Sequence, residues 1–141
     1  MNSIISQEDK IFLQQVESCG FPISEFNHKA HIRLGYIYLA GMSLESALDR
    51  MRNSLTNLLS HNEIAPEGKY HETLTKAWLI AILCFMKKSE GCVLFDHFIE
   101  ANPELLSSDL LLHHYAKATL FSDQARTQFV EPDELPFPDL S

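Results

Sequence analysis

The sequence predicts an all-α fold: a single-domain helical bundle of about six helices, followed by an irregular, proline-rich C-terminal tail. Apolar residues recur at three- and four-residue spacings, whereas no segment shows sustained apolar/polar alternation. Capping residues precede most of these apolar segments. The length of 141 residues is that of one domain. We divide it into a helical domain, residues 1–130, and an acidic tail, residues 131–141.

Three helices are predicted in the first half of the chain, over residues 7–18, 28–41 and 44–60. Ser6, Asn27 and Ser43 stand immediately before them and are typical N-cap residues. The second helix is apolar on almost every side, which places it in the centre of the bundle. The third has one apolar face and one polar face, as expected of a helix that covers a core.

The second half begins with a predicted polar loop, residues 61–69. A second central helix follows over residues 70–87, again apolar on most sides. Ser89 is expected to cap a fifth helix, and shorter helical turns are expected to begin at Asn102 and Ser108. Ser122 is expected to cap a last short helix that ends near residue 129.

The tail carries three prolines, which exclude a helix there. Two arrangements are open. The tail either lies along the body through Leu135 and Phe137 or is disordered.

Composition excludes several classes of protein. Eleven basic against 19 acidic residues give a net charge of −8, which disfavours binding to nucleic acid through its phosphates. No apolar run approaches the roughly 18 to 20 residues of a membrane span, and the N-terminus lacks the pattern of a secretion signal. The three cysteines (Cys19, Cys84 and Cys92) form no C-x-x-C pair. We therefore expect a soluble, cytoplasmic protein with no nucleic-acid or membrane partner.

Histidines gather at the starts of the two central helices. His28 and His31 share a side of the second helix, and His71 opens the fourth. Gly35 lies one turn beyond His31, where glycine costs about 1 kcal/mol relative to alanine, so we expect a close approach of another element or a ligand there. In an up-down bundle the second and fourth helices run parallel. Their histidine-bearing starts would then lie at one end of the molecule.

Three imidazoles with a nearby carboxylate suit one divalent metal ion of unknown identity. In this interpretation His28, His31 and His71 are the metal ligands. Glu72 is the fourth ligand or the catalytic general base. The alternative is that these side chains satisfy one another and nearby backbone groups within a bundle.

Three further residues are candidates for substrate binding. Thr75 and Trp78 share a helix face with His71 and could line a pocket, although aromatic residues at such spacing are more often core. Arg126 could clamp a ligand carboxylate or hold the tail through Glu131 or Asp133, and we favour the second role.

Two functions remain open at this point. One is a divalent-metal-dependent reaction on a small molecule, such as a hydrolysis. The other is a non-catalytic ligand-binding or protein-interaction module with structural histidines. No nucleophile motif or phosphate-binding loop decides whether the protein is an enzyme. A homodimer whose pocket is completed by the partner's tail is also compatible with the sequence.

Three segments resemble the motifs of a family of small, uncharacterised bacterial helical proteins. Residues 26–33 read F-N-H-K-A-H-I-R, residues 70–78 read Y-H-E-T-L-T-K-A-W, and residues 122–133 contain S-D-Q-A-R and E-P-D. The resemblance spans about residues 26–138 and implies no particular reaction, because no activity is established for that family. It implies that the matching motif positions are His28, His31, His71, Glu72, Thr75, Trp78 and Arg126. The histidines outside the motifs are His61, His97, His113 and His114.

Overall fold

The computed structural model describes residues 5–89 and 94–138, which contain eight α-helices, three 3-10 helices and no strand. The all-α prediction is therefore confirmed for this part of the chain. The α-helices are α1 (Gln7–Glu17), α2 (His28–Gly41), α3 (Leu44–His61), α4 (Pro66–Lys69), α5 (Glu72–Lys88), α6 (Phe95–Ala101), α7 (Lys117–Leu120) and α8 (Asp123–Thr127). The 3-10 helices are η1 (Ile23–Glu25), η2 (Pro103–Leu106) and η3 (Leu110–His113). Cys92 lies outside the described residues. So do the start of the predicted helical domain, residues 1–4, and the end of the predicted tail, residues 139–141.

Local capping explains where most of the predicted helices begin. The side-chain oxygens of Ser6, Asn27, Ser43 and Ser122 each accept a hydrogen bond from the backbone N–H three residues later. Each hydrogen bond satisfies a donor that the first turn of a helix leaves without an intrahelical partner. The predicted starts of α1, α2, α3 and α8 are therefore confirmed.

Ser89 does not cap the fifth predicted helix. It is the C-terminal cap of α5, and its hydroxyl accepts a hydrogen bond from the Asn102 side chain. The next helix, α6, begins only at Phe95 and has no side-chain N-cap. The described residues contain more helices than the six predicted, because the predicted loop contains α4 and the region that follows α6 forms several short helices.

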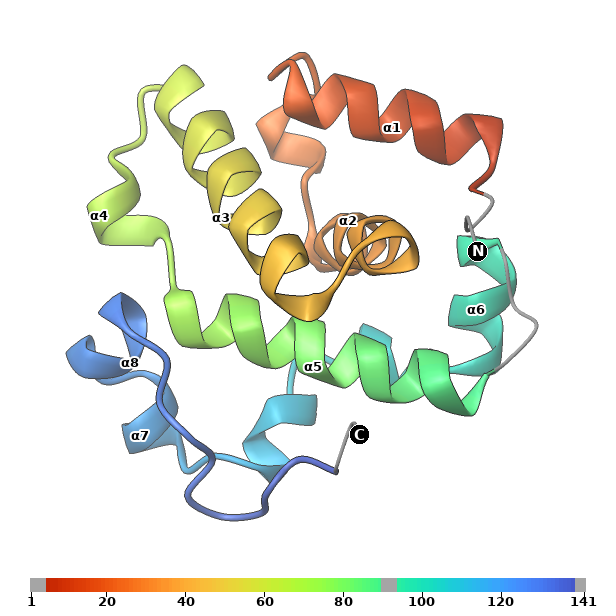
Figure 1. Cartoon of the computed structure of the whole chain (residues 1–141). Helices are drawn as coiled ribbons and strands as arrows, with labels where there is room; N and C mark the ends of the chain where they lie inside the picture. Colours follow the sequence, from red (N-terminus) through yellow and green to blue (C-terminus); the bar gives the residue numbers. More distant parts are fainter. Residues whose placement is uncertain (1–4, 90–93, 139–141) are drawn as a thin grey trace.

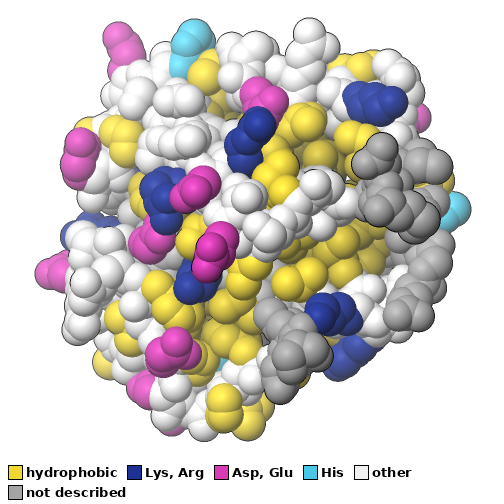
Figure 2. All heavy atoms as spheres, viewed as in Figure 1, with side chains coloured by type: hydrophobic (Ala, Val, Ile, Leu, Met, Phe, Trp, Pro, Cys, Tyr) yellow, Lys and Arg dark blue, Asp and Glu magenta, His cyan; other side chains and the backbone are white. Residues whose placement is uncertain are grey.

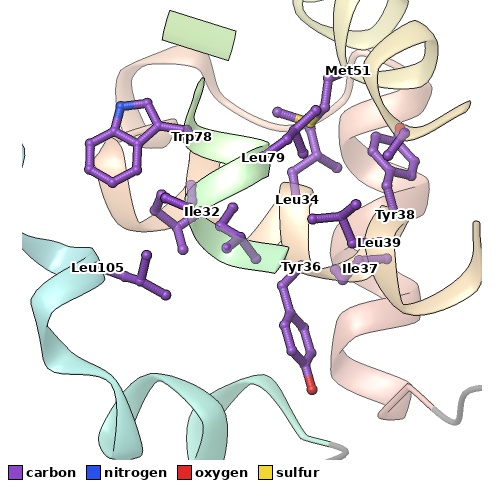
Figure 3. Close-up of a cluster of buried hydrophobic side chains, with 14 of the residues drawn as sticks. Ile32, Leu34, Tyr36, Ile37, Tyr38, Leu39, Met51, Trp78, Leu79 and Leu105 are labelled. Carbon is purple, nitrogen blue, oxygen red and sulfur yellow. The ribbon is translucent and has the colours of Figure 1, made fainter. Parts of the chain in front are cut away.

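The core surrounds the two apolar helices α2 and α5, as their sequences predict. Figure 3 shows side chains of both helices packed with residues of neighbouring elements, including Leu34, Leu79 and Leu105. At Gly35, an added Cβ would lie 2.8 Å from Cδ1 of Ile82. The predicted close approach at this glycine is therefore that of α5, and the missing side chain lets the two helices pack closely.

The two central helices cross instead of running parallel. Figure 1 looks along α2, whereas α5 lies across the view beneath it. Their relative orientation therefore differs from that of the expected up-down bundle. No helix among residues 5–89 and 94–138 is long and apolar enough to span a membrane.

The C-terminal segment, residues 130–138, lies along the body of the protein. Of the two arrangements left open by the sequence, this is the ordered one. The buried Thr73 hydroxyl donates to the Gln128 carbonyl and accepts from the Val130 N–H. Further along, the Phe137 ring lies 4.6 Å from the His114 ring, centroid to centroid. Leu135 remains 53% exposed, so Phe137 makes the apolar contact that was expected of both residues.

Candidate functional site

A pocket of about 430 Å³ lies where α2 and α5 begin, bordered by η1, the C-terminal half of α3 and α4. Figure 1 shows α4 between the end of α3 and the start of α5 at one edge of the molecule. The apolar lining residues are Ile23, Phe26, Leu55, Leu58, Leu59, Ile64 and Leu74. The polar lining residues are Asn27, His28, His31, Lys69, Tyr70, His71 and Thr75. The pocket therefore brings together the three predicted histidines, although their helices are not parallel.

His28 is already hydrogen-bonded to the protein backbone. Its Nε2 atom lies 2.9 Å from the carbonyl oxygen of Leu105 in η2. Because a carbonyl only accepts, Nε2 must carry the proton and donate it. The other side of the ring contacts Trp78, with centroids 4.7 Å apart. His28 thus joins α2 to both η2 and α5.

His71 was predicted to lie in the first turn of the helix that is α5. In the structure it is the N-cap of α5. Its Nδ1 accepts the N–H of Leu74 at 3.0 Å, in the way that a capping oxygen usually does. Nε2 therefore carries the proton and donates to the Leu120 carbonyl at 2.9 Å. Burial lowers the pKa of His71, which favours this neutral form.

His31 is the most strongly desolvated histidine of the pocket. Burial and, second, the neighbouring His28 lower its pKa to about 4, so the ring is neutral at physiological pH. Part of the ring lines the pocket, but its Nε2 atom is buried and has no hydrogen-bond partner within the described chain. Phe26 lies beside it, with ring centroids 6.3 Å apart. His31 therefore contributes a largely apolar surface to the pocket.

Glu72 lies on a different side of α5 from the histidine pocket. Its two carboxylate oxygens accept from Arg52 Nε at 3.1 Å and Nη2 at 2.7 Å, and the Tyr70 hydroxyl donates a further hydrogen bond of 2.7 Å. Burial raises the pKa of Glu72, but these hydrogen bonds outweigh it and hold the pKa below its usual value. A carboxylate bound in this way is a poor proton acceptor, and it does not line the pocket with the three histidines.

The predicted substrate-binding residues are placed differently from one another. Thr75 lines the pocket, but its hydroxyl donates to the His71 carbonyl at 2.7 Å. Trp78 is only 5% exposed and lies in the core (Figure 3), where its ring contacts that of His28. Arg126 does not line this pocket. It lines a second one, which shares Tyr70 with the first, and forms an ion pair of 3.1 Å with Asp123 of its own helix.

Arg126 does not hold the tail through Asp133. That carboxylate instead accepts from the Ala116 N–H at 3.0 Å and the Thr119 hydroxyl at 2.6 Å. Arg126 pairs instead with Asp123, three residues before it on the same helix, a spacing at which side chains are neighbours.

Lys69 and Tyr70 are polar lining residues that the sequence analysis did not propose for the site, and the apolar lining was not proposed either. Lys69 comes from the segment predicted to be a loop, which contains the single turn α4 with Pro66 in its first position. Tyr70 was predicted to begin the next helix and is instead the C-terminal cap of α4. Proline in the first position of α4 could have signalled the turn, but no local pattern shows that it borders the starts of α2 and α5.

Figure 2 shows the contrasting surface around α3, where basic side chains lie beside acidic ones.

The geometry gives the predicted metal ion no support. Within the described ranges, no group of three or more His, Cys, Asp or Glu side chains is arranged to hold a metal ion. Both ring nitrogens of His71 and one of His28 already have backbone partners. A metal at His71 would have to displace either the helix cap or the hydrogen bond to Leu120.

Comparisons with family models, curated proteins and solved structures give no match for this chain. The resemblance to the bacterial family, the divalent metal and the homodimer therefore stay predictions. Function has to be inferred from the residues of the chain itself.

Proposed function

We propose that the protein binds a small, largely apolar molecule in the pocket between α2, α3 and α5, without catalysing a reaction on it. The observation that carries this proposal is the pocket itself. Its volume of about 430 Å³ lies within the range of roughly 300 to 1,000 Å³ that is typical of small-molecule sites. Its walls are mainly leucine, isoleucine and aromatic side chains, as in most such sites.

The states of the polar groups favour binding over catalysis. His28 and His71 donate to backbone carbonyls and thereby join separate elements. The low pKa of His31 makes it a weak base, and its Nε2 is shielded from solvent. A general base must be able to reach the proton that it removes and must hold it near neutral pH. Neither His31 nor His71 meets both conditions, because burial lowers the pKa of each and both ring nitrogens of His71 have backbone partners.

A neutral fluorescent probe, N-phenyl-1-naphthylamine, tests the proposal, because its emission increases in an apolar environment. We expect saturable binding to the folded protein. Leu55→Trp places a large side chain in the pocket and is expected to weaken binding about tenfold or more, equivalent to about 1.4 kcal/mol.

Leu48→Trp is the matched control. Leu48 lies two helical turns before Leu55 on α3, is also half-buried, and does not line the pocket. The probe should bind this variant as it binds the wild type. Absence of saturable binding, or equal weakening by both substitutions, would show that the pocket is not a binding site.

A further inference from the structure

The charges around the pocket point to a ligand class, and this inference rests on the proposed binding function. We propose that the ligand is an amphipathic monoanion: an apolar body that fills the pocket and a single negatively charged head group that lies near Lys69. The proposal depends on which charges line the pocket and which of them already have partners.

The pocket contains no acidic side chain, although the chain as a whole is strongly acidic. There are 19 Asp and Glu residues in the sequence and a net charge of −8, yet none of the described ones lines this pocket. Lys69 is the one lysine or arginine of its lining. An anionic head group inside the pocket would therefore meet one cation and no carboxylate in the lining itself.

Lys69 is also available, unlike three arginines that are paired within the protein. Arg33, Arg52 and Arg126 form ion pairs with Asp9, Glu72 and Asp123. Lys69 lies at the end of α4, is exposed, and has no ion-pair or hydrogen-bond partner through its side chain within the described residues. A ligand anion would not have to displace an internal carboxylate to reach it.

The three histidines do not replace Lys69 as the cation. His28 and His71 point a protonated Nε2 at backbone carbonyls, and His31 is neutral because it is buried. The rings of His31 and His71, whose pKa values burial lowers, add no charge to the inner wall, which suits the apolar body of the ligand. A second charge deep in the ligand would lose its hydration there without gaining a partner, so a single terminal charge is expected.

Displacement of N-phenyl-1-naphthylamine by four eight-carbon compounds separates the head group from the body. The competitors are octanoate, octyl sulfate, octanol and octylamine. They are compared at about pH 8, which is above the ordinary pKa of a histidine side chain. We expect octanoate and octyl sulfate to bind about three- to fivefold more tightly than octanol, the effect of one exposed charge pair, and octylamine to bind most weakly. The preference should shrink when salt is raised from about 0.05 M to 0.5 M.

Substitution of Lys69 tests whether this lysine causes the preference for anionic ligands. Lys69→Met should abolish the preference for the anions without changing the binding of octanol, and Lys69→Glu should reverse the order of octanoate and octylamine. Lys29→Met is the control, because Lys29 is an exposed cation at the start of α2 that lies outside the lining of this pocket. The Lys29→Met variant should prefer the two anions over octanol to the same extent as the wild type does.

The outcomes distinguish this inference from the proposed function. Two results would contradict the proposal that the ligand is a monoanion but leave the proposed binding of an apolar molecule intact. In the first, the probe binds in the pocket but octanol competes as well as octanoate. In the second, Lys69→Met and Lys29→Met show the same preference. If the probe does not bind at all, or binds independently of Leu55, the binding function itself fails.

Discussion

Two neighbouring residues, His71 and Glu72, begin α5 and belong to two different environments. His71 borders an apolar pocket, is neutral, and has both ring nitrogens bonded to backbone groups. Glu72 borders a charged cluster in which Arg52 binds it through two hydrogen bonds. One peptide bond therefore separates a polar residue that stays neutral from one that stays ionised.

The comparison shows how partners decide the fate of a desolvated group. Burial disfavours the charged form of both residue types, so an imidazole loses its proton and a carboxylate tends to gain one. His31 has no acidic partner to oppose this effect, and its pKa falls to about 4. Glu72 has a guanidinium and a phenol as donors, and its pKa remains low. The pocket is consequently suited to apolar binding, and the Arg52 cluster to holding α3 against α5.

The largest expected effect comes from titration of His31. Its pKa is about 4 in the folded protein and about 6.5 when unfolded, so the unfolded state binds more protons between these values. Stability should therefore rise with pH across this window, and lowering the pH from 6.5 to 4 should cost up to about 3 kcal/mol from this residue. Urea unfolding of wild type and His31→Gln at several pH values measures the difference.

His97→Gln is the control for that series, because His97 is exposed on α6. Its curve should run parallel to that of the wild type. If His31→Gln keeps the full dependence between pH 4 and 6.5, the neutral, desolvated state of His31 is wrong.

On the charged side, Glu72→Gln should lower the free energy of unfolding by about 1 to 2 kcal/mol, since it removes a half-buried ion pair whose arginine remains partly solvated. Asp49→Asn is the matched control. Asp49 also accepts from Arg52, but its side chain is 73% exposed, so the loss should stay below about 0.5 kcal/mol. Chemical denaturation measures both variants. Equal losses would contradict the special role of Glu72.

The same substitution should leave the pocket unchanged, because Glu72 does not line it and the amide oxygen of Gln can still accept from Tyr70, which does. N-phenyl-1-naphthylamine should bind Glu72→Gln with the affinity of the wild type. A marked change in that affinity would mean that the two sides of α5 are coupled.

Replacing the cap of α5 should have a smaller effect. His71→Ala removes both the acceptor for Leu74 and the donor for Leu120, with an expected loss of about 1 kcal/mol. His71→Asn restores a good N-cap without the second hydrogen bond, so it should recover part of that loss. Thermal unfolding compares the two variants, and equal stabilities would show that Nδ1 does not cap the helix.

The smallest effect is expected at Arg126. Its ion pair with Asp123 is exposed, so Arg126→Ala should change the free energy of unfolding by less than about 0.5 kcal/mol. Limited proteolysis should cut the C-terminal segment at the wild-type rate in this variant and faster in Asp133→Ala, which loses the contacts to Ala116 and Thr119. Faster cleavage in Arg126→Ala alone would support the role that the sequence predicts for Arg126.

The sequence by itself determined the features that depend on residues three or four positions apart. Ser6, Asn27 and Ser43 cap the N–H three residues later, and such short-range hydrogen bonds form wherever the helix forms. The apolar character of α2 and α5 likewise determined that these helices would be central. Gly35 predicted a close neighbour, although not which one.

Only the tertiary structure decided which distant groups meet. The steep crossing of α2 and α5, the carbonyls of Leu105 and Leu120 that accept from the histidines, and the pairing of Glu72 with Arg52 all join segments far apart in the chain. No local pattern encodes such partners, because they depend on how complete helices pack around the core. The two histidine-bearing helix starts meet as the sequence predicts, but packing made their meeting place an apolar pocket.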